Sequence, residues 1–99
     1  MPAYLVVNYK IENPDLYGEY QAGAGPALKI GSETKLVAFE PKSEVLEGSP
    51  GHQTIILEFE SKEKALAMYR SEAYQAVVGK RLSATEGFAV LSQAMNVGG

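Results

Sequence analysis

The sequence predicts an α+β fold in which strands and helices follow the order β-α-β-β-α-β. Three observations carry this prediction. Apolar, β-branched and aromatic residues fill segments 3–11, 35–39, 54–60 and 88–93, as expected of strands. Helix-capping residues follow the first and third of these segments. Both helix-bearing connections are long enough to lead the chain back over one face of a four-stranded sheet.

Composition limits the classes of function. The 99 residues suffice for one domain, predicted over residues 1–94 with a short tail at 95–99. The net charge is −3 and basic residues are scattered, so nucleic acid is not an expected partner. Cysteine is absent, which excludes disulfides and thiol catalysis. The first residues form neither a signal peptide nor a membrane span, so we expect a cytoplasmic protein without a membrane partner.

The first strand and the first helix have clear sequence signals. Residues 3–11 are apolar at both odd and even positions, which is typical of a central strand covered on both faces. Asn13-Pro14-Asp15 provides a cap, a proline at the first helical position and an acid in the first turn. The predicted buried stripe of this helix comprises Leu16, Tyr20, Ala24, Ala27 and Leu28.

The end of this helix is less regular. Gly25 and Pro26 favour a kink or break, because glycine is costly in a helix and proline lacks a backbone donor. Gly31 is suited to the left-handed residue that terminates a helix. Residues 35–39 then form the second strand, and 40–53, rich in Pro, Gly and Ser, form a surface connection.

The second half repeats the strand and helix pattern. In segment 54–60, Ile55, Leu57 and Phe59 share one face, and Thr54, Ile56 and Glu58 share the other. Ser61 caps a helix that directs Ala65, Met68 and Tyr69 inward, and Phe59 is predicted to lie in the core beneath it. Ser71 begins a further helix through Leu82 that buries Tyr74, Val77 and Val78, and residues 88–93 close the sheet.

This order is that of the ferredoxin-like βαββαβ sandwich, with an antiparallel-type sheet. Its helices cover one face of the sheet only, yet the strands offer apolar residues to both faces. The same face of a second chain is the natural cover, because an isologous contact buries two such patches at once. We therefore expect a homodimer formed through the open sheet face.

Short fragments spread over nearly the whole chain occur in the order and spacing of a known family. They are residues 3–7 (AYLVV), Asn13-Pro14 with Tyr17 and Tyr20, Pro26-Ala27-Leu28 before Gly31, Val45-Leu46-Glu47-Gly48, Ile56-Leu57-Glu58-Phe59 followed by Ser61, and Tyr69 with Ser71, Tyr74 and Gln75. The chain resembles a small family catalogued as a domain of unknown function (family 1330), in the dimeric α+β barrel superfamily of ferredoxin-like proteins. The resemblance implies a dimeric α+β barrel. Relatives in that superfamily include cofactor-free monooxygenases, haem-degrading enzymes and isomerases.

The chain departs from this family pattern at two places. Met68 stands where the family commonly has a tryptophan, which reduces the aromatic lining of any pocket. His52-Gln53 replaces a more basic pair, which removes an anchor for an acidic ligand. Haem degradation is not expected, because His52 has no evident partner ligand in the sequence.

Asn8 and His52 each have a structural and a functional interpretation. Asn8 is either a buried amide satisfied by a neighbouring strand or a group that orients a substrate carbonyl or dioxygen, and the structural interpretation is slightly favoured. His52 is interpreted first as a solvated loop residue and second as a general base at the mouth of a pocket.

Glu58 lies between apolar neighbours, so its carboxylate must be paired or hydrated. The favoured interpretation is a structural ion pair or hydrogen-bonded anchor, with Lys10 or Arg81 or at the subunit contact, and the alternative is a raised pKa and acid–base chemistry. The first and third strands are expected to be parallel neighbours in the sheet, which predicts that Asn8 and Glu58 lie close together. Four tyrosines are interpreted mainly as core or interface residues, of which one or two line a cavity: Tyr17, Tyr20, Tyr69 and Tyr74.

Two classes of function remain open. One is a noncatalytic dimeric protein that binds a small apolar or aromatic molecule in a cavity near the sheet, and the other is a cofactor-free monooxygenase or isomerase. Neither class requires a cofactor or metal, and none is expected. The candidate ligand-binding residues are Asn8, Tyr20, His52, Glu58, Tyr69 and Tyr74.

Overall fold

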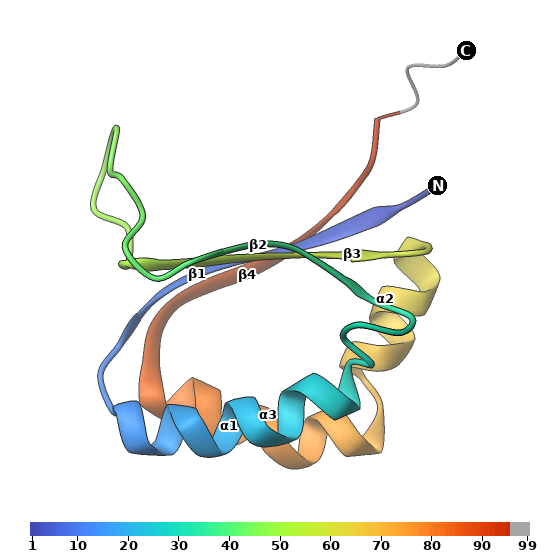
Figure 1. Ribbon diagram of the computed structural model, residues 1–99, viewed down its shortest axis with the longest axis horizontal. Helices are drawn as coiled ribbons and strands as arrows, with labels where there is room; N and C mark the ends of the chain where they lie inside the picture. Colours follow the sequence, from blue (N-terminus) through green and yellow to red (C-terminus); the bar gives the residue numbers. More distant parts are fainter. Residues whose placement is uncertain (96–99) are drawn as a thin grey trace.

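The computed structural model describes residues 1–95 and contains one antiparallel sheet with helices along one side (Figure 1). Its elements are β1 (Ala3–Ile11), α1 (Pro14–Ala27), β2 (Lys35–Glu40), β3 (Gln53–Phe59), α2 (Lys62–Tyr69), α3 (Glu72–Ala84) and β4 (Thr85–Gln93). The four strands lie in the order β2-β3-β1-β4. The predicted α+β fold class is confirmed. Of the tail predicted at residues 95–99, residues 96–99 lie outside the described residues.

One predicted detail of the sheet is wrong. β1 and β3 are neighbours as expected, but they are antiparallel, and every other pairing in the sheet is antiparallel too. Each helix-bearing crossover skips one position in the sheet, and the strand between its ends runs in the opposite direction. β1 therefore meets β3 and β4 with reversed polarity.

Helix α1 begins as predicted and ends differently. The Asn13 side chain accepts a hydrogen bond from the Leu16 backbone N–H at 3.1 Å. The predicted break at Gly25 is absent: α1 continues to Ala27, and Pro26 lies in its last turn, where the missing N–H costs one hydrogen bond and only one helical residue follows. Lys29, with φ of 54°, is the residue after the helix that takes the left-handed conformation, while Gly31 takes a positive φ in the following turn.

The second crossover contains two capped helices. The hydroxyl oxygens of Ser61 and Ser71 accept hydrogen bonds from the N–H groups of Lys64 and Tyr74. Helix α3 leads directly into β4, which begins three residues earlier than predicted. Gly87, which lies outside the predicted strand, is paired within β4, and a Cβ there would collide with the β1 backbone at Asn8. Glycine thus permits the close approach of the two strands.

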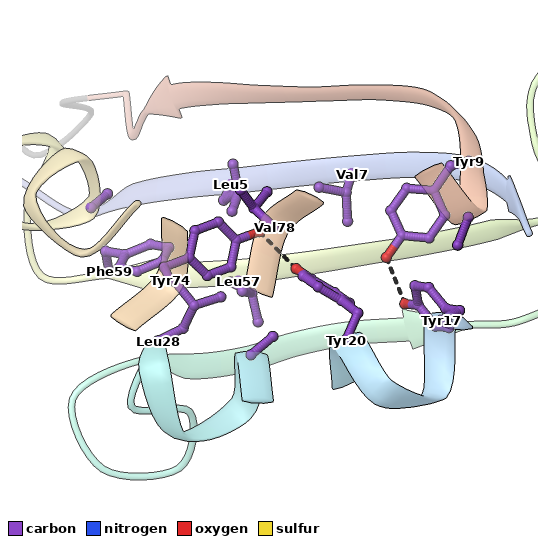
Figure 2. Close-up of a cluster of buried hydrophobic side chains, with 13 residues drawn as sticks. Leu5, Val7, Tyr9, Tyr17, Tyr20, Leu28, Leu57, Phe59, Tyr74 and Val78 are labelled. Atoms are coloured by element: carbon purple, nitrogen blue, oxygen red, sulfur yellow. Dashed lines mark hydrogen bonds between the residues drawn. The ribbon is translucent and has the colours of Figure 1, made fainter. Parts of the chain in front are cut away.

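The core lies between the sheet and the helices. Odd-numbered β1 residues and the Phe59 face of β3 point toward the helices, and Phe59 is 2% exposed, as predicted. Buried tyrosines from β1, α1 and α3 extend into the space between the layers (Figure 2). The even-numbered face carries no helix (Figure 1). Among residues 1–95, no helix combines the length and apolar character needed to cross a bilayer.

Candidate functional site

Four tyrosines meet between the helices and the sheet. The hydroxyl oxygens of Tyr9 in β1 and Tyr17 in α1 are 2.5 Å apart, and those of Tyr20 in α1 and Tyr74 in α3 are 2.7 Å apart (Figure 2). The Gln53 amide donates a further hydrogen bond to the Tyr17 hydroxyl at 2.8 Å. These phenols satisfy one another inside the core, as buried polar groups must.

Burial governs the ionisation of this tyrosine cluster. Desolvation is the main cause that raises the pKa of Tyr9, Tyr17, Tyr20 and Tyr74 above the ordinary value for tyrosine. The nearby Arg81 guanidinium opposes this rise in pKa, but it is the weaker effect for each ring. The phenols are therefore protonated at neutral pH. They can donate or accept hydrogen bonds but cannot serve as strong bases.

Arg81 is buried beside these rings. It is 5% exposed, and its guanidinium carbon lies 5.8 Å from the Tyr9 ring centroid and 5.9 Å from that of Tyr20. Its Nε is buried without a hydrogen-bond partner. The ion pairs among residues 1–95 join Lys29 to Glu33, Lys64 to Glu60 and Lys80 to Glu19, and none includes Arg81.

The compensation available to this cation is small. A cation–π contact contributes about 0.5–2 kcal/mol. A position in the last turn of a helix, as Arg81 has in α3, contributes about 0.3–2 kcal/mol. Burying an ion costs several kcal/mol, which these terms offset only in part. Part of the free-energy cost of burying the Arg81 guanidinium is therefore not compensated by these two interactions, and a bound anion would reduce it.

An apolar cavity of about 190 Å³ lies beside the tyrosine cluster, between α1 and the sheet. Its wall includes Val7, Tyr20, Ala24, Leu36, Ile55 and Leu57. Leu36 and Phe39 of the edge strand β2 are 46% and 47% exposed, so the cavity opens at this edge. We call it the α1 cavity. It combines apolar walls with a few phenol hydroxyls, as small-molecule sites commonly do.

The predicted ligand-binding residues divide into two groups. Tyr20 and Tyr74 belong to the tyrosine cluster, and the Tyr69 ring centroid is 5.1 Å from that of Tyr74. Asn8, His52 and Glu58 lie away from the cluster and do not line the α1 cavity. The structure therefore unites the three tyrosines and leaves the other polar candidates elsewhere.

Asn8 and His52 hold the β2–β3 connection against β1. The Asn8 side-chain amide donates to the Gly51 carbonyl at 3.1 Å and to the Thr54 hydroxyl at 3.0 Å, and its oxygen accepts from the Gly51 N–H at 2.7 Å. The His52 Nε2 accepts from the Ile11 N–H at 3.1 Å, and its Nδ1 is 3.0 Å from the Pro41 carbonyl oxygen. Each side chain thus has a structural partner for its polar atoms.

Glu58 lies on the open sheet face, and its predicted proximity to Asn8 is wrong. Antiparallel pairing places Glu58 opposite Tyr4, whereas Asn8 is opposite Thr54. Four residues along a strand separate the two sites by about 13 Å. The favoured ion pair with Lys10 or Arg81 is likewise not found among residues 1–95. The Glu58 carboxylate instead raises the pKa of Tyr4 by a hydrogen bond and by its charge.

Sequence reasoning did not select Tyr9, Tyr17, Gln53 or Arg81 as site residues. The sequence suggested a role for Arg81 only as a partner of Glu58. A signal was nevertheless present, because Arg81 follows Tyr74 by seven residues and Val78 by three, which places it on the buried stripe of α3. No group of three or more His, Asp or Glu side chains that could hold a metal ion occurs within residues 1–95.

The raised tyrosine pKa values predict alkaline unfolding. The folded state favours the protonated phenols, so their contribution is fully present below the unfolded tyrosine pKa of about 10 and is lost as pH rises above it. We expect the tyrosinate absorbance at 295 nm from these four rings to rise together with loss of the far-ultraviolet circular dichroism signal. Ionisation of all six tyrosines while the dichroism is unchanged would contradict the buried placement of the cluster.

Comparison with solved structures identifies proteins of the same fold. RPA0582 from Rhodopseudomonas palustris, described as a protein of unknown function, has 19% sequence identity and a TM-score of 0.75 over 96% of this chain and 83% of that chain. SnoaB from Streptomyces nogalater, described as a cofactor-independent oxygenase, has 8% identity and a TM-score of 0.67 over 97% and 95%. HapK from Hahella chejuensis has 10% identity and a TM-score of 0.60 over 94% and 92%. These likenesses establish a common fold.

Comparison at the level of sequence gives a narrower result. No curated protein matches the chain significantly. One family model matches residues 2–95, which is nearly the entire chain. The chain therefore belongs to the family described as Domain of unknown function (DUF1330).

Proposed function

We propose that the protein binds a small aromatic molecule in the α1 cavity. The single observation that carries the proposal is an apolar cavity that is lined in part by tyrosines and open at the β2 edge. Apolar walls favour the ring of a ligand, and hydroxyl groups of Tyr17 and Tyr20 offer hydrogen bonds to one polar substituent.

The volume limits the size of this ligand. An apolar cavity of about 150 Å³ accommodates benzene in another protein. The α1 cavity, at about 190 Å³, suits one or two fused rings with a small substituent. Phenols and indoles are therefore the classes that we expect to bind.

A cavity-filling substitution tests this proposal. Gly25 lines the α1 cavity, and a Cβ added there meets no atom within 4 Å. We expect Gly25→Leu to weaken indole binding at least tenfold, because the new side chain occupies ligand space. Binding is measured from amide chemical shifts of Ile55 and Leu57 during an NMR titration with indole.

Gly18→Leu is the matched control for this substitution. Gly18 also lies in α1 with open space around an added Cβ, but it does not line the cavity. Both substitutions improve helix propensity by about 1 kcal/mol, so they differ in position and not in helix propensity. Equal indole affinity of the two variants, or no binding by the parent protein, would refute the proposal.

Catalysis without a cofactor is the second candidate. The observation in its favour is the fold shared with SnoaB, which is described as a cofactor-independent oxygenase. The residues that line the α1 cavity include no carboxylate and no imidazole, so a group suited to take a proton from a substrate is lacking there. Binding is therefore the preferred function. Oxygen uptake with cavity-binding phenols, abolished by Gly25→Leu, would favour the oxygenase instead.

We further propose that the working form is a homodimer joined through the open sheet face. Cross-strand pairing aligns Ala38, Ile56, Val6 and Val90 in one apolar row that crosses all four strands. Val90 and the neighbouring Phe88 are 48% and 52% exposed. A continuous apolar row on a face without helices supports contact with the same face of a second chain.

A further inference from the structure

A second hollow, whose lining includes Tyr9, lies between α3 and β4. Its volume is about 230 Å³, and Tyr9, Tyr69, Arg81, Leu82 and Thr85 are among the residues that line it. We call it the arginine pocket. A neighbouring hollow of about 240 Å³ under α2, the α2 cavity, shares Tyr69 and Ala89 with it. The two hollows therefore adjoin along β4.

Arg81 is the only charged residue in the lining of either hollow, among the residues that the structure describes. The residue is 5% exposed, its Nε has no acceptor, and no carboxylate of residues 1–95 pairs with it. The Thr85 hydroxyl, which also lines the pocket, donates to the backbone carbonyl of Arg81 at 2.7 Å and leaves the guanidinium unaided. An anion from outside the chain would stabilise a buried guanidinium that has no carboxylate partner.

We propose that the arginine pocket binds the carboxylate of a small organic acid whose apolar part lies in the α2 cavity. A guanidinium presents parallel N–H donors that match the two oxygens of a carboxylate. Its single positive charge balances a monoanion, whereas a phosphate dianion would need a second cation that the lining does not supply.

The apolar part of the ligand follows from the adjoining α2 cavity. Leu5, Ala65, Leu66 and Leu91 line this hollow together with the shared Tyr69 and Ala89. An acid with a phenyl or short alkyl group would bury that group here while its carboxylate reaches Arg81. A fully polar acid would leave these walls without contact.

This site is separate from the α1 cavity proposed above. Tyr9 lines both the α1 cavity and the arginine pocket, and it is the one residue that their linings share. Gly25 lines only the former, and Arg81 lines only the latter. Failure of either proposal therefore leaves the other intact, and Gly25→Leu is expected to retain acid binding.

The experiment compares 3-phenylpropionate with its neutral amide by calorimetry on the full chain. We expect the acid to bind the parent protein at least tenfold more tightly than the amide, because only the acid neutralises the guanidinium. Equal binding of the two compounds, or no binding of the acid at millimolar concentration, would overturn the proposal. This comparison needs no substitution, so it stands whether or not a variant folds.

Two variants assign the effect to Arg81. Arg81→Met removes the charge at similar volume, and we expect acid binding to fall at least tenfold while the difference between acid and amide disappears. Lys80→Met removes the same charge from the preceding residue, which pairs with Glu19, and should leave the preference for the acid unchanged. A preference that survives Arg81→Met, or disappears in Lys80→Met, would place the anion elsewhere.

Stability of the ligand-free variant separates a binding role from a structural one. If Arg81 serves a ligand, Arg81→Met relieves an unpaired buried charge, and we expect its Tm to equal or exceed that of the parent. If Arg81 instead stabilises the core through the Tyr9 and Tyr20 rings, Arg81→Met lowers the Tm. The latter result would overturn the proposal.

Discussion

Replacing Phe59 with alanine is expected to lower the free energy of unfolding by about 3–5 kcal/mol, the usual cost of removing a buried phenylalanine side chain. Phe59 is 2% exposed and lines the α2 cavity under helix α2. Removal of the ring would enlarge an existing cavity, and we expect neighbouring side chains to fill little of the added space. Urea denaturation followed by circular dichroism at one fixed protein concentration measures the loss.

Phe88→Ala is the control, because Phe88 is 52% exposed on the open sheet face. Both substitutions delete the same atoms from a strand, but only the first empties the core. A loss below about 1 kcal/mol for Phe59→Ala would be the size expected of a surface position and would contradict its burial.

Features that depend on residues close together in the sequence were predicted more accurately than features that depend on tertiary contacts. Capping by Asn13, Ser61 and Ser71 depends on hydrogen bonds within three residues, and all three helix starts were predicted correctly. The end of α1 and the start of β4 depend on tertiary contacts instead. The predicted fourth strand began at residue 88, yet Gly87 is a strand residue, and glycine is needed there because β1 passes too closely for a side chain.

The candidate site was predictable only in part for the same reason. Strand alternation places Tyr9 on the helix-facing side, but it does not reveal that Tyr9 meets Tyr17 from α1. The burial of Arg81 depends on how α3 packs, and charge alone suggests a surface position. Asn8 and Glu58 were wrongly predicted to be close because β1 and β3 were expected to be parallel. The relative direction of two strands is not encoded in their local sequences; it follows from the order in which the connections cross the sheet.

His52 and Gln53 stand at the start of β3, where the family pattern has a more basic pair. The resemblance implied that a basic anchor for an acidic ligand had been replaced by His52-Gln53. In the structure, His52 hydrogen-bonds to backbone groups of Ile11 and Pro41 and Gln53 to Tyr17, so both serve packing. Arg81 supplies a buried cation from a different element. The chain thus keeps a group that is suited to an acidic ligand.

Charge placed on the open face is expected to separate the proposed dimer. Val90 lies in the apolar row and is 48% exposed within one chain, so Val90→Glu should leave the fold intact. In an isologous dimer it would bury two carboxylates, each at a cost of several kcal/mol. We expect the dimer dissociation constant to rise at least 100-fold, equivalent to about 2.8 kcal/mol.

Sedimentation equilibrium at micromolar concentration measures this change, with the parent expected at twice the mass of the chain. Leu82→Glu provides the control, because Leu82 is 64% exposed on α3, on the opposite side of the sheet, and should leave the dimer intact. A parent protein that sediments as a monomer would refute the pairing of open faces. If the dimer persists in Val90→Glu but dissociates in Leu82→Glu, the interface lies on the helical side of the chain. The reason is that an added charge disrupts an assembly only where the two chains are in contact.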